Sequence, residues 1–167
     1  MGAGSKAAAS GGNGHASAVT TVLRAYADRG VFRGFTATPL ARGRTTYEFH
    51  WLLRPPMRAV FDDRAGTLTF PAIVPGVDRS SPIVAGLDAL VAARTARALP
   101  VHKRLDARRA RVSARVQRGD WFLVVAIRGA NHAYAVQRAL NLINELFLFL
   151  HESHPEYLIE RFGLSAE

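Results

Sequence analysis

The chain of 167 residues is long enough for one domain with its own core, and 49% of its residues are hydrophobic. It contains no cysteine, which excludes disulfides, thiolate nucleophiles and cysteine-ligated zinc or iron-sulfur sites. Its formal net charge is +9, and the window from Arg94 to Arg118, with nine basic side chains and one acidic, accounts for +8 of it. A charge concentrated in this way indicates an anionic partner at one place on the surface.

The N-terminal segment is rich in glycine, alanine and serine. Because such residues bury too little apolar surface to offset the entropy of ordering, we expect residues 1–14 to form a flexible tail and residues 15–167 to form a single α+β domain. The tail lacks the apolar stretch of a secretory signal, and no charge-free apolar run reaches the roughly eighteen residues of a membrane span. We therefore expect a cytoplasmic protein without a membrane span.

The first half of the chain predicts one helix followed by strands. Apolar residues at helical spacing begin at Ala16, and Arg29-Gly30 ends this helix. Alternating apolar and polar residues then predict an antiparallel meander of about four strands. These strands cover residues 32–40, 44–53, 57–61 and 67–70. Between the last two, residues 62–66 have the composition of a hairpin loop.

The second half predicts a helix, a hairpin and two further helices. Ser81 followed by Pro82 matches an N-cap with proline at the first helical position, which indicates a helix from Pro82 to about Ala98. A β-hairpin is expected over residues 108–117 and 121–128, and helices over residues 132–152 and 155–162. Gly163 is expected to end the last of these helices as its C-cap. The expected architecture is α+β, with the helices packed on one face of an antiparallel sheet.

The basic window predicts an anion-binding surface. Strand alternation places Arg109, Arg111 and Arg115 on one face, where each guanidinium offers a planar fork to a phosphate. Trp121 and Phe122, just across the turn, carry rings on which bases can stack. The candidate anion- or nucleic-acid-binding residues are Arg104, Arg108, Arg109, Arg111, Arg115 and Arg118. The alternative is that these arginines form a solvated surface that binds no ligand. The chain has twenty arginines and two lysines, a bias that the codon usage of a GC-rich genome also produces.

The remaining titratable and nucleophilic residues match no catalytic pattern. His151 and His154 are three residues apart, whereas the zincin motif needs a spacing of four with a glutamate as base. Asp62-Asp63 fits loop chemistry, and Ser80-Ser81 fits helix capping. We therefore predict no catalytic residues, no metal and no cofactor. Three further histidines are expected to be exposed: His50, His102 and His132.

The long C-terminal helix has an apolar face wider than a small sheet covers. We predict that Phe147, Leu148 and Phe149 form an interface with a protein partner or with a second copy of the chain. A homodimer is the expected oligomeric state.

The order helix, antiparallel strands, helix, hairpin and helix over residues 16–162 resembles that of small α+β binding proteins such as the type III secretion chaperones. This resemblance implies a protein that dimerises and holds partner segments without catalysis, although the basic charge of the chain departs from the acidic charge usual in those chaperones. The sequence thus predicts a non-enzymatic binding or scaffold protein, chaperone- or adaptor-like. The alternatives are a nucleic-acid-binding module that uses residues 94–118 and an enzyme without a recognisable motif.

Overall fold

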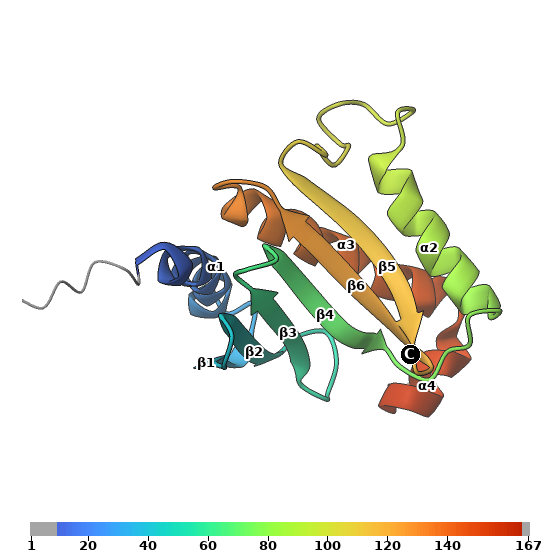
Figure 1. Ribbon diagram of the computed structural model, residues 1–167. Coiled ribbons are helices and arrows are strands. Elements are labelled where there is room, and N and C mark those ends of the chain that lie inside the picture. The colour runs from blue at the N-terminus through green and yellow to red at the C-terminus, as the bar shows by residue number, and fades with distance from the viewer. Residues whose placement is uncertain (1–9, 165–167) are drawn as a thin grey trace, which may run out of the picture.

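The computed structural model describes residues 10–164, and their side chains from Gly14 onward. The elements are α1 Ser10–Asp28, β1 Arg33–Pro39, β2 Arg44–His50, β3 Met57–Asp62, β4 Thr67–Val74, α2 Pro82–Thr95, β5 Ala110–Gln117, β6 Asp120–Ile127, α3 His132–Ser153 and α4 Pro155–Phe162. They form an α+β fold, as predicted, with the helices packed against an antiparallel sheet (Figure 1). Within residues 10–164, none of the helices has the length and hydrophobicity that crossing a bilayer requires.

The predicted meander and hairpin join into one sheet of six strands, in the order β1-β2-β3-β4-β6-β5. The junction is antiparallel pairing of β4 with β6, in which Leu68 lies opposite Val125. As a result β1 and β5 are the two edge strands, and the arginine-rich strand β5 has a neighbour on one side only.

Side-chain alternation determines which face of the sheet the helices cover. In β6, Trp121, Leu123 and Val125 are fully buried, whereas Phe122 and Val124 on the other face are partly exposed. The indole of Trp121 donates a hydrogen bond to Asp88 of α2 at 2.9 Å, which identifies its face as the helical one. Of the two rings predicted to stack on bases, Trp121 is therefore buried in the core, and Phe122 is the one that lies on the other face.

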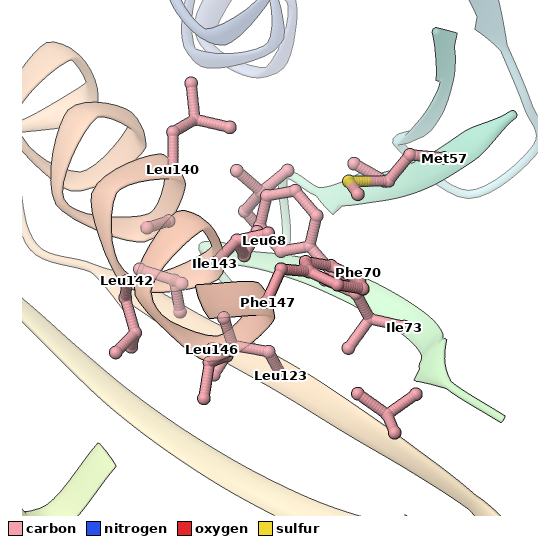
Figure 2. Packing of buried hydrophobic residues seen from close by; sticks show 14 of the residues in the cluster. Met57, Leu68, Phe70, Ile73, Leu123, Leu140, Leu142, Ile143, Leu146 and Phe147 are labelled. Carbon is pink, nitrogen blue, oxygen red and sulfur yellow. The ribbon is translucent and has the colours of Figure 1, made fainter. Parts of the chain in front are cut away.

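Among the described helices, α3 contributes the largest number of buried residues to the core. Ten of its residues are buried, and Figure 2 shows Ile143 and Phe147 facing Leu68 and Phe70 of β4. This continuous apolar contact fixes α3 across the middle of the sheet.

Local signals for the ends of elements are confirmed. The hydroxyl of Ser81 accepts the Ile83 N–H at 3.1 Å, so Ser81 is the N-cap of α2. Gly163 adopts a left-handed conformation at the end of α4, with φ of 62°. In the β3–β4 loop, the Asp62 carboxylate accepts the N–H groups of Arg64 and Ala65.

Five boundaries differ from the prediction by two residues or more. Two of them are the C-terminal ends of strands: β2 ends at His50 rather than at residue 53, and β4 continues to Val74 rather than ending at residue 70. Helix α1 begins at Ser10, inside the segment predicted to be a tail, and residues 1–9 of that segment lie outside the described part of the chain. Helix α2 ends at Thr95 because the next residue, Ala96, is extended. Strand β5 begins at Ala110 rather than at residue 108, since Asp106 accepts the backbone N–H of Arg108 and holds it in a turn.

Two neighbouring residues of α3 test this packing. Phe147 is 4% exposed and Leu148 is 53% exposed. We expect Phe147→Ala to lower the free energy of unfolding by about 3–5 kcal/mol, because it leaves a cavity in the core. Leu148→Ala should change that free energy by no more than about 0.5 kcal/mol. Equilibrium unfolding in urea measures both, and equal losses would show that α3 is placed incorrectly.

Candidate binding surfaces

The open face of the sheet is the side that carries no helix in the described structure, and its centre is a row of small and β-branched side chains. The row runs across five strands, each residue lying opposite the next: Ser113, Val124, Thr69, Val60 and Thr46. Its last four members are only partly buried. The open face is therefore a broad platform with little side-chain bulk at its centre.

Arginines border this platform. Arg111 and Arg115 project from β5 and are exposed, and the guanidinium carbon of Arg115 lies 5.4 Å from the centre of the Phe122 ring. Arg58 of β3 donates a hydrogen bond to the Thr46 hydroxyl at 3.2 Å. Cationic and aromatic groups therefore lie beside one another at the β5 end.

Of the three arginines predicted to share one face of the hairpin, Arg111 and Arg115 do so, but the prediction for Arg109 is wrong. Arg109 precedes β5 and turns toward α3, where its Nε donates to the side-chain oxygen of Asn131 at 3.0 Å. Its guanidinium carbon also lies 3.8 Å from the centre of the Tyr134 ring. Asn131, the N-cap of α3, and Tyr134 in its first turn lie far from Arg109 in sequence, and they hold its side chain away from the open face.

The other predicted arginines lie in two different places, since Arg104 and Arg108 line the same pocket and Arg118 lines another. Arg108 pairs with Asp106 at 3.2 Å, and this hydrogen bond is the main reason why the pKa of the Asp106 carboxyl lies below its usual value. Arg104 is half-buried beside a pocket of about 350 Å³ in the segment that joins α2 to β5. Arg118 lies in the β5–β6 turn and borders a hollow of about 650 Å³ together with Arg79 and Arg161. The six candidates therefore do not form one site.

A second candidate surface is the groove between α1 and α3, with a volume of about 580 Å³. Tyr26 of α1 and Tyr134 of α3 both line it, and each ring lies under a guanidinium. Arg29 is 4.6 Å from the centre of the Tyr26 ring, and Arg109 covers Tyr134 as described above. Val22 adds an apolar contact surface. Sequence analysis missed this groove because its two tyrosines are more than a hundred positions apart and no local pattern links them.

The predicted interface residues of α3 are not all available to a partner. Phe147 is buried in the core, and Phe149 is half-buried against Gly86 of α2, where its ring occupies the space that a side chain at position 86 would need. Leu148 is the exposed member of the three. The homodimer stays a prediction.

Of the three histidines predicted to be exposed, His50 and His102 are, but His132 is 7% exposed and the prediction for it is wrong. His132 opens α3, and its Nε2 lies 3.1 Å from Nδ1 of His15 in α1. Burial is the main cause that lowers the pKa of His132, and His15 adds to it, while Asp63 acts in the opposite direction. The pair connects α1 to α3 next to the core.

The other groups with shifted pKa values form hydrogen bonds that connect parts of the fold. Burial raises the pKa of Tyr47, whose hydroxyl bonds to the Thr20 hydroxyl, and that of Tyr157, whose hydroxyl donates to the Pro75 carbonyl. The backbone of Ser80 lowers the pKa of Asp78 in the turn before α2. Within residues 10–164, no three metal-binding side chains come together.

Comparison of the chain with family models, with curated proteins and with solved structures found no match. Function therefore has to be inferred from the open face and from the α1–α3 groove.

The buried histidine predicts how stability depends on pH. Since the folded state lowers the pKa of His132, the unfolded chain takes up a proton more readily, and the free energy of unfolding should fall as pH drops below about 6.5. In His132→Gln this fall should be shallower. Urea unfolding at a series of pH values measures the slope, with the exposed His102→Gln as the control. Equal slopes in the wild type and in His132→Gln would contradict the assignment.

Proposed function

We propose that this chain is a non-catalytic binding protein, chaperone- or adaptor-like, that takes a segment of another protein in the α1–α3 groove. The observation that carries the proposal is the pair of tyrosine rings, one on each helix, that lie under Arg29 and Arg109. Tyrosine and arginine are enriched among the side chains that dominate protein interfaces, since each offers a large contact area and a polar end.

The groove is organised before a partner arrives. The Tyr134 hydroxyl accepts the backbone N–H of Asp106 at 2.8 Å, and Asn131 holds the guanidinium of Arg109. On the other helix, the Tyr26 ring stacks on the buried Phe32, with ring centres 5.7 Å apart. Because these side chains are already ordered, binding costs less conformational entropy.

The charge of the groove favours an acidic partner. Neither Arg29 nor Arg109 forms an ion pair with a carboxylate in the part of the chain that the structure describes. A segment with an apolar anchor between the tyrosines and aspartate or glutamate beside it satisfies both arginines. Such a segment is the kind of partner that we propose.

Selection from a library of short random peptides tests this function. We expect the peptides that bind wild-type protein to be enriched in apolar and acidic residues, and the double variant Arg29→Glu/Arg109→Glu to bind them about tenfold more weakly or worse, because it replaces attraction by repulsion. Calorimetric titration of selected peptides measures the change.

The matched control is Arg97→Glu/Lys103→Glu, which makes the same change of charge at exposed positions in the segment between α2 and β5. Its affinity for the peptides should stay near that of the wild type. The proposal fails if selection yields no binders, or if charge reversal in the groove weakens binding no more than reversal in the control does.

A further inference from the structure

We infer that the open face binds single-stranded nucleic acid over β4, β6 and β5, with phosphates held by Arg111 and Arg115 and a base stacked on Phe122. This site lies on the side of the sheet away from the helices, so it is separate from the α1–α3 groove. It adds a second partner to the proposed function and does not depend on it.

The shape of the open face suits an extended strand. Ser113, Val124 and Thr69 lie opposite one another on three neighbouring strands and form a low surface roughly 10 Å across. Val124 and Thr69 are only partly buried, so a ligand can reach them. A wide, shallow platform of this kind accommodates unpaired bases laid side by side.

The positions of the exposed arginines predict that the phosphates lie along the edge strand β5. Arg111 and Arg115 are four residues apart on one face of a strand, which separates their backbones by roughly 13 Å. Both are exposed, and neither pairs with a carboxylate within the described residues. Two acidic residues of this face, Glu48 and Asp62, are on β2 and β3. A third, Asp120, lies at the very start of β6, where its carboxylate accepts the Gly76 N–H at 3.0 Å. An anionic ligand is therefore expected over the β4–β6–β5 half of the platform.

The aromatic ring favours a nucleotide over an acidic polypeptide. Phe122 lies directly opposite Arg115 in the β5–β6 pairing, and the guanidinium is 5.4 Å from the ring centre. A nucleotide presents both a phosphate and a flat base to such a pair. The acidic polypeptide proposed for the α1–α3 groove needs two rings with an apolar anchor between them, whereas β4, β5 and β6 place one aromatic ring, that of Phe122, on the open face. Arginines on an edge strand also prevent aggregation, but that role needs no ring beside them.

Fluorescence anisotropy with labelled oligothymidylate, and with a duplex as comparison, tests this site over a series of salt concentrations. We expect the single strand to bind more tightly than the duplex, and log affinity to fall linearly with log salt. In Arg111→Ser/Arg115→Ser the slope should be smaller by about 1.4, since each lost phosphate contact in a single strand removes about 0.7. Phe122→Leu should weaken binding roughly 5- to 150-fold and leave the slope unchanged.

Controls separate this site from the overall positive charge of the protein. Arg97→Ser/Lys103→Ser removes the same charge from exposed positions outside the open face and should keep wild-type affinity. If the serine variant aggregates, Arg111→Lys/Arg115→Lys keeps the charge of the edge strand and should still weaken binding, because it removes the bidentate forks. Ultraviolet cross-linking of the wild type to oligothymidylate should label the β6 peptide that contains Phe122.

Three results would overturn the inference. The first is an absence of binding at low salt. The second is an equal loss of affinity in the control variant, which would indicate attraction without a site. The third is effective competition by polyglutamate together with wild-type affinity in Phe122→Leu, which would assign the open face to an acidic polypeptide instead.

Discussion

Strand alternation gives the sheet one apolar side, and the position of every helix follows from that constraint. In β6 the side chains of Trp121, Leu123 and Val125 all point the same way and are fully buried, so the helices must cover them. Helix α3 packs on the middle of the sheet, and α1 packs beside α3. Helix α2 contacts α3 and β5, and α4 contacts α3 (Figure 1). The other side of the sheet then carries partly exposed residues such as Phe122 and Val124. One pattern in the strands thus produces both candidate surfaces.

A few polar contacts fix the helices on the apolar side, where packing alone specifies position less precisely. Tyr47 of β2 bonds to Thr20 of α1, and His15 of α1 meets His132 of α3. Buried polar groups need partners, so these contacts favour one arrangement of α1 over its alternatives. The groove that carries the proposed function exists because α1 and α3 are held in this arrangement.

The sequence predicted those features that depend on neighbours along the chain. Alternation predicted the strands, and Ser81, Asp62 and Gly163 predicted ends and turns, because caps and turns are local. Burial of His132 and the direction of Arg109 were missed, because their partners lie in distant segments: His15 for the histidine, and Asn131 and Tyr134 for the arginine. The groove between α1 and α3 was missed for the same reason. The residues of a site that is assembled from distant segments form no recognisable motif in the sequence.

Native-state thiol labelling at two adjacent positions of β6 tests most directly that one side of the sheet is open. The chain has no cysteine, so Val124→Cys and Val125→Cys each introduce a single thiol. Val124 is on the open face and Val125 is fully buried under the helices. The structure predicts that Cys at position 124 reacts rapidly in the folded protein, while at position 125 it reacts only through unfolding. Equal protection at both positions would show that something covers the open face, and would contradict its assignment as a binding surface.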